Sequence, residues 1–177
     1  GWEADSEALA YRRGARPQAG RNVAIAEWHT AHGPADYVLF AGLVPVGVVE
    51  AKRRRRTARD ALEQAARYAR GYAATVGETM AGPWGVGAET HHVPFLFATN
   101  GRGFLRQIVE QSGVWFRDAR RATNHPRALD GWYTPGGLLE LLRQDEGNAD
   151  QALRDTPTDA LPLRDYQHAA VRAVETA

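Results

Sequence analysis

Residues 33–52 read GPADYVLFAGLVPVGVVEAK, and this stretch decides the fold. The apolar and aromatic residues at 37–40 predict one strand, and the apolar run that ends at Lys52 predicts a second. A glycine between the two runs supplies a turn. Strands joined in this way run antiparallel, so the start of the first lies beside the end of the second. The sequence therefore predicts a hairpin in which Asp36 faces Glu50 and Lys52.

Lys52 is the only lysine of the chain, since the other 21 of its 22 basic residues are arginines. Side chains on a strand alternate between its two faces, so Val48, Glu50 and Lys52 share one face. Lysine is a compact ammonium that can give up a proton, which suits it to contact an attacking water or a phosphate. Two carboxylates beside it would be costly to bury alone, and a divalent cation that prefers oxygen ligands is their natural partner. The alternative is a surface ion pair at the end of a hairpin.

Gln64 and Tyr68 are spaced i, i+4 on residues 57–72, whose Ala, Leu, Glu, Gln and Arg content favours a helix. Together with Pro-Ala-Asp at 34–36 and Glu-Ala-Lys at 50–52, this pattern resembles the PD-(D/E)xK nuclease core. The resemblance implies an α/β, restriction-endonuclease-like fold, in which helices flank a mixed β-sheet. It also implies that Gln64 and Tyr68 lie beside a metal site and contact DNA. The alternative is an ordinary amphipathic helix that packs its alanine and leucine side chains inward.

The same resemblance implies roles for the residues around the hairpin. Asp36, Glu50 and the backbone carbonyl of Ala51 would hold Mg²⁺, for which Mn²⁺ can substitute. Lys52 would orient or deprotonate the attacking water, or stabilise the developing oxyanion. Members of the family usually carry a further acid on a leading helix, and this chain starts where that helix would finish. Glu27, nine residues before Asp36, is the nearest acid that could take its place.

Further segments narrow the resemblance to one family. Residues 21–28, 93–102 and 124–129, taken with the hairpin, resemble the amino-terminal nuclease region of the motor-and-cleavage (R) subunit of type I restriction enzymes. Residues 161–171 resemble the leader before the first ATP-binding motif of superfamily-two helicase motors. The ATP-binding loop itself needs a second lysine, which the chain lacks. ATP would therefore bind only in a motor domain outside this chain.

The resemblance implies three parts. They are an endonuclease domain at 1–144, a linker at 145–163 and the truncated start of a helicase-like motor domain at 164–177. It also implies a type I site-specific deoxyribonuclease, which cuts double-stranded DNA in an ATP-dependent restriction system. The methyltransferase and specificity subunits would be its partners, and the specificity subunit would select the sequence. Two alternatives remain: a non-catalytic DNA-docking or assembly module with a nuclease-like fold, and a different helicase-nuclease.

Charge along the chain agrees with DNA binding. The net charge is +1, but residues 1–70 hold 12 basic and 8 acidic side chains, whereas residues 71–177 hold 10 and 13. The motifs thus lie in the positive half, as contact with a phosphate backbone requires. Arg53, Arg54, Arg55 and Arg56 form its densest part, and we expect them to grip phosphates without reading sequence.

Composition excludes several kinds of site. The chain has no cysteine, which excludes disulfides and thiolate metal sites and agrees weakly with a cytoplasmic location. There is no signal peptide and no apolar stretch near 18 residues, so we expect no membrane association. The six histidines lack the spacing of a tetrahedral zinc site, and we expect them to be polar loop or surface residues.

The remaining sequence predicts mixed α/β structure. Strands are expected at 93–99, 104–110 and 113–118, and a loop at 77–87. Helices are expected at 136–144 and 164–175, the first after the capping pair Thr134-Pro135.

Overall fold

A computed structural model describes residues 1–144 and 162–175 of this chain. The strands are β1 (Glu3–Ala4), β2 (Asn22–Thr30), β3 (Gly33–Ala41), β4 (Val44–Ala51), β5 (Phe95–Thr99), β6 (Val114–Asp118) and β7 (Arg127–Ala128). The α-helices are α1 (Leu62–Arg70), α2 (Pro135–Arg143) and α4 (Asp165–Glu175). Short 3-10 helices are η1 (Tyr11–Arg13), η2 (Arg59–Ala61), η3 (Gly87–Glu89) and η4 (Val109–Gln111). The expected linker at 145–163 lies mostly outside the described residues.

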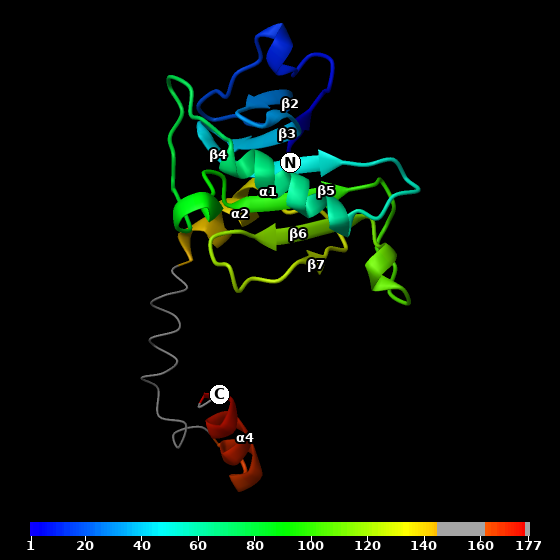
Figure 1. Ribbon diagram of the computed structural model, residues 1–177, viewed down its shortest axis with the longest axis vertical. Coiled ribbons are helices and arrows are strands. Elements are labelled where there is room, and N and C mark those ends of the chain that lie inside the picture. The colour runs from blue at the N-terminus through cyan, green and yellow to red at the C-terminus, as the bar shows by residue number, and fades with distance from the viewer. Residues whose placement is uncertain (145–161, 176–177) are drawn as a thin grey trace. The chain divides into compact units, whose positions relative to one another are not determined.

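The strands form one seven-stranded sheet whose spatial order follows the sequence from β1 to β7 (Figure 1). The pairs β1/β2 and β4/β5 are parallel, and the other four pairs are antiparallel. Such a mixed sheet with flanking helices confirms the predicted α/β, restriction-endonuclease-like class.

Both faces of the sheet are covered, as the alternation along β5 shows. Leu96 and Ala98 belong to the buried cluster that includes the apolar side of α1. Phe95 and Phe97 point the other way and join a second cluster with Leu138 of α2. In Figure 1, α1 crosses in front of the central strands and α2 lies behind them. The two hydrophobic clusters therefore hold the sheet between two layers of helix.

The β3/β4 hairpin has the predicted arrangement. Gly42, with φ of 62°, makes the turn in a backbone region that residues with a side chain rarely adopt. The strands pair in antiparallel register from Ala41 with Val44 to Tyr37 with Val49. The chain then crosses through α1 to β5, which runs parallel to β4. As a result, one end of the sheet holds the start of β3 and the ends of β4 and β5. We call this end the site edge.

Two predictions were wrong, one about a strand and one about a histidine side chain. Residues 104–110 form no strand but a loop that ends in η4, because the backbone bonds to itself: Ile108 N–H donates to Leu105 O and Ser112 N–H to Val109 O. All six histidines were expected to be polar loop or surface residues, and this was wrong for His91, which is only 5% exposed. Its backbone pairs with that of Trp84 in an isolated bridge within the segment before β5.

Other elements agree with prediction apart from their ends. The helix expected at 57–72 is shorter, because η2 precedes it and α1 ends at Arg70 before Gly71. The strand expected at 93–99 begins at Phe95, and the helices expected at 136–144 and 164–175 are α2 and α4.

Contacts divide the chain into two units, Gly1–Leu142 and Arg143–Ala177. The first holds the sheet and both hydrophobic clusters. The second contains α4, where the side-chain oxygen of Gln167 accepts a hydrogen bond from the backbone N–H of Arg164. Within the described residues, no helix has the length and apolar character needed to cross a membrane.

Candidate active site

Asp36 and Glu50 meet at the site edge, where β3 begins and β4 ends. The last pair in register is Tyr37 with Val49, so the next residue outward on each strand is Asp36 or Glu50. Asp36 Oδ2 accepts a hydrogen bond of 2.6 Å from the backbone N–H of Ala51. The hairpin thus places the two carboxylates side by side on neighbouring strands.

Glu50 is unusual because it is an acid with only 4% of its surface exposed. Burial raises the pKa of its carboxyl group, the hydrogen bond from Lys52 lowers it, and the charge of Asp36 raises it again. The net direction is upward, so the surroundings of Glu50 disfavour its charge even with an ammonium in contact. A second positive partner at this place would relieve that cost.

Lys52 links Glu50 to helix α1. Its Nζ donates to Glu50 Oε1 over 2.5 Å and to Gln64 Oε1 over 2.8 Å. Gln64 Nε2 in turn donates to the hydroxyl oxygen of Tyr68 over 2.7 Å. The backbone N–H of Lys52 also donates to Thr99 O, at the end of β5. Four side chains from a strand and a helix therefore form one hydrogen-bonded row, which fixes the direction of the ammonium group.

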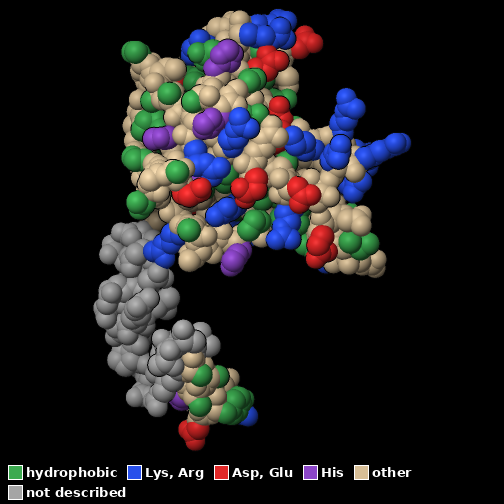
Figure 2. Space-filling view, in the orientation of Figure 1, with side chains coloured by type: hydrophobic (Ala, Val, Ile, Leu, Met, Phe, Trp, Pro, Cys, Tyr) green, Lys and Arg blue, Asp and Glu red, His purple; other side chains and the backbone are tan. Residues whose placement is uncertain are grey.

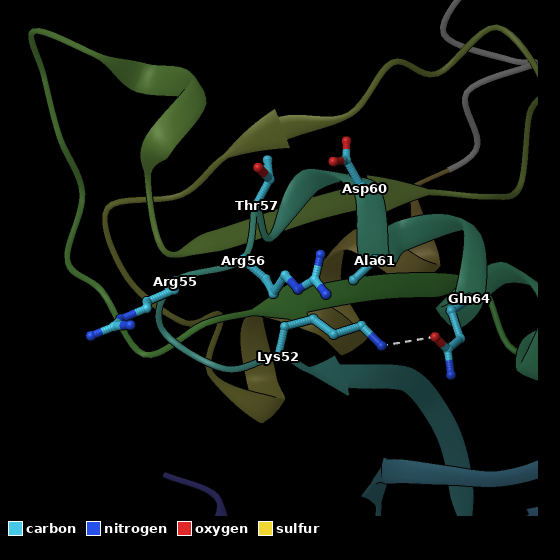
Figure 3. A pocket seen from close by; sticks show the side chains of 7 residues that line it. All are labelled: Lys52, Arg55, Arg56, Thr57, Asp60, Ala61 and Gln64. Atoms are coloured by element: carbon cyan, nitrogen blue, oxygen red, sulfur yellow. Dashed lines mark hydrogen bonds between the residues drawn. The ribbon is translucent and has the colours of Figure 1, made fainter.

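A hollow of about 490 Å³ adjoins this row. Its lining consists of Lys52, Arg55, Arg56, Thr57, Asp60, Ala61 and Gln64. Figure 3 shows Lys52 and Arg56 extending the same way, toward α1, while Arg55 points away from them. We call residues 53–56 the basic loop, and all four of its arginines are exposed. Figure 2 shows basic side chains gathered over the protruding segment that follows β4. The hollow is thus open to solvent and bordered mainly by positive charge.

Asn100 was not predicted as a site residue, yet it holds the basic loop in place. It is 4% exposed, and its Nδ2 donates to the backbone oxygen of Arg56 over 2.7 Å. Its Oδ1 accepts from the backbone N–H of Arg102, and its own backbone N–H donates to Gly113 O. The available signal was a polar residue directly after a buried strand, but that signal also fits any turn.

Glu27 lies on β2 at the level of Asp36, because the register pairs Ala26 with Tyr37 and Trp28 with Ala35. Its backbone has φ of 54°, and its carboxylate pairs with Arg12 Nε at 2.7 Å. The side chain is 53% exposed. Across residues 1–144 and 162–175, no group of three or more histidine, aspartate or glutamate side chains is close enough to hold a metal ion. The acids gathered at the site edge are therefore Asp36 and Glu50.

Comparison with known proteins assigns the family. Residues 3–142 match the family model described as the second domain of the type I restriction enzyme EcoKI endonuclease subunit. The chain belongs to this family. It is also 37% identical, over 203 aligned residues, to the type I restriction enzyme EcoKI endonuclease subunit of Escherichia coli strain K12. That alignment covers all of this chain and 17% of the relative. No solved structure matches.

The residues that match the family model include the complete sheet, α1 and the site edge. Asp36, Glu50 and Lys52 therefore lie within the part of the chain that the family model describes. The helix α4 lies beyond that part.

Proposed function

We propose that this chain cleaves DNA within a type I restriction enzyme, by hydrolysis of phosphodiester bonds at the site edge. One observation carries the proposal: a buried acid, Glu50, lies beside a second acid and in contact with the only lysine of the chain. The relative is named as an endonuclease subunit, which agrees with this chemistry. Because the chain spans 17% of that relative, the activity of the whole protein is part of the proposal.

The residues at the site edge fit a divalent cation. Hard cations such as Mg²⁺ and Mn²⁺ prefer carboxylate and carbonyl oxygens, and Asp36, Glu50 and the carbonyl of Ala51 offer that set. The raised pKa of Glu50 supports the assignment, since a buried acid that lacks enough positive charge gains most from a cation. When bound, the cation would lower the pKa of a water molecule and offset negative charge on the phosphate.

The other side chains would position the reacting groups. Lys52, fixed between Glu50 and Gln64, would orient or deprotonate the attacking water, or stabilise charge on the phosphate. Gln64 would hold the ammonium in place through its oxygen, and Tyr68 would hold Gln64. The predicted contact of these two residues with DNA then falls mainly to Gln64, because Tyr68 is 9% exposed.

The basic loop would bind the phosphates that flank the cleaved bond. Arg55 and Arg56 border the hollow beside Lys52, and Arg53 and Arg54 are exposed on the same loop. Contacts of this kind bind DNA through charge and carry no sequence information. Sequence choice would therefore belong to the specificity subunit, alongside a methyltransferase subunit, and ATP would act in a motor domain outside this chain.

The decisive experiment uses the complete restriction enzyme that carries this domain. Asp36→Ala and Lys52→Ala should each reduce cleavage of circular duplex DNA by at least about a hundredfold, because each removes a group that acts on the reacting phosphate. Hydrolysis of ATP should continue at the wild-type rate. Asp130→Ala, which removes an exposed acid of the loop before α2, serves as the matched control.

Retained cleavage in either site variant would contradict the proposal. The alternative function, a non-catalytic docking module, predicts full cleavage by Asp36→Ala together with salt-sensitive DNA binding that needs no metal.

A further inference from the structure

The loop between β5 and β6 exposes an unusual group of apolar side chains. We call residues 102–112 the apolar loop. Leu105 is 39% exposed, Ile108 50% and Val109 36%. Single exposed apolar residues are common on protein surfaces, but three on one short loop are not, and such clusters usually mark a contact surface.

The base of this loop is rigid. Gly113 N–H donates to Gly103 O over 3.1 Å, and Leu105 N–H donates to Oγ of the fully buried Ser112 over 3.0 Å. A Cβ atom at Gly113 would lie 1.9 Å from Arg102 O, so the two ends of the loop approach each other as closely as glycine allows. The apolar side chains are therefore held outward on a fixed support, at little further cost in conformational entropy.

The apolar loop leaves the sheet at the site edge. It begins after β5, whose end lies beside the end of β4 that carries Glu50 and Ala51. Asn100 connects the two loops, since it donates to Arg56 O and accepts from the Arg102 N–H. Figure 1 shows the segments after β4 and after β5 projecting from the same end of the sheet. The exposed apolar residues therefore lie on the side of the molecule that holds the candidate active site.

The charges around the apolar loop favour a nucleic acid as its partner. Arg102 and Arg106 belong to the loop, against a single acid, Glu110, and the basic loop is joined to it through Asn100. An apolar tip framed by arginines matches duplex DNA, which presents phosphates outside and stacked bases inside. Proteins that kink DNA insert Leu, Ile or Phe side chains between base steps in this way, with basic residues on the flanking phosphates.

We propose that Leu105 and Ile108 insert between base steps of the duplex and bend it beside the bond to be cleaved. The proposal rests on the proposed function, because it takes duplex DNA as the polymer at the site edge. It adds a second mode of contact, by apolar insertion, to the phosphate contacts of the basic loop. A bend at this place would open the groove and bring the backbone toward Asp36, Glu50 and Lys52.

The test compares the chain of 177 residues with its double variant Leu105→Ser and Ile108→Ser. A short duplex labelled at both ends reports bending by energy transfer, and titration at several salt concentrations reports affinity. The double variant should bind about tenfold more weakly and should no longer bend the duplex, because serine offers little apolar surface to bury between the bases. The dependence of affinity on salt should stay unchanged, because the arginines still contact phosphates.

The matched control is Val76→Ser with Val86→Ser, which removes two exposed apolar residues from the loop before β5. It should bind and bend DNA like the wild type. Both double variants should keep the wild-type melting temperature, because every changed side chain is exposed. The single variant Leu105→Ser should show a smaller loss of the same kind.

Three outcomes would overturn the proposal. They are a wild-type chain that does not bind the duplex, a wild-type chain that binds it without bending it, and a double variant that bends the duplex as well as the wild type. None of these outcomes would contradict the proposed function. That function would be contradicted by a separate result, cleavage of DNA by the restriction enzyme that carries Asp36→Ala.

Discussion

Glu50 is the residue at which stability and function oppose each other. Its carboxylate is buried, its pKa is raised chiefly by burial, and the nearby Asp36 adds a like charge. Lys52 compensates only in part. A carboxylate kept in such a place weakens the fold at neutral pH, and residues of this kind concentrate at functional sites.

The substitution Glu50→Gln should therefore stabilise the metal-free chain. The glutamate of an unfolded chain has a pKa near 4.5, and the pKa of Glu50 in the folded chain is higher. The folded state thus holds the proton more tightly, so stability from this group is complete below pH 4.5 and is lost as pH rises through the folded pKa. The variant should gain about 1 kcal/mol at pH 7 and little at pH 4, as measured by urea unfolding.

With Mg²⁺ present, the wild type should become more stable than Glu50→Gln. The wild type should gain about 2.7 kcal/mol at a Mg²⁺ concentration one hundred times its dissociation constant, whereas Glu50→Gln should gain much less. Glu140→Gln, on the exposed side of α2, should behave as the wild type in both respects. If Glu50→Gln instead changed the free energy of unfolding equally at pH 4 and pH 7, the charge of Glu50 would not be what weakens the fold at neutral pH.

At the scale of elements, Asn100 joins the basic loop to the apolar loop through hydrogen bonds to Arg56 and Arg102. Asn100→Ala should lower the free energy of unfolding by about 1–2 kcal/mol, because the Arg56 carbonyl and the Arg102 N–H lose their hydrogen-bond partner. It should also weaken duplex binding, since the arginines of the basic loop are no longer held in one arrangement. Asn124→Ala, in the turn after β6, is the control. Unchanged DNA binding in Asn100→Ala would show that the two loops act independently.

The hairpin could be predicted from sequence because two local signals agree there. Apolar runs of strand length flank a glycine turn, and alternation along β4 places Glu50 and Lys52 on one face. The register that follows sets Asp36 beside Glu50. To predict the contact of Lys52 with Gln64, one must also know that α1 packs against this face of the sheet, and the local pattern does not give that.

The segment 104–110 was predicted as a strand and forms a loop, since its composition fits both. The structure is decided by hydrogen bonds within and across the loop, which composition does not specify: Gly113 N–H donates to Gly103 O, and Ser112 Oγ accepts from the Leu105 N–H. Asn100 and His91 were missed for the same reason. Burial of a polar side chain depends on which elements pack over it, and a single sequence does not contain that information.

At the scale of the whole molecule, the mixed sheet explains why the site lies where it does. One antiparallel step from β3 to β4 and one parallel crossover to β5 bring three strand ends to the site edge. The acids, the lysine and both loops all arise from these ends. The layer of α1 then supplies Gln64 and Tyr68 to one face of the sheet, while α2 covers the other.

We propose that Asp36 and Glu50 together hold a divalent cation for DNA cleavage. The most direct measurement is a calorimetric titration of Mn²⁺ into the chain with a duplex present, for the wild type, Asp36→Asn and Glu50→Gln. Asn and Gln keep the shape of each acid but remove its charge, so we expect Mn²⁺ to bind to the wild type and not to either variant. Equal Mn²⁺ binding by all three proteins, or none by the wild type, would contradict it.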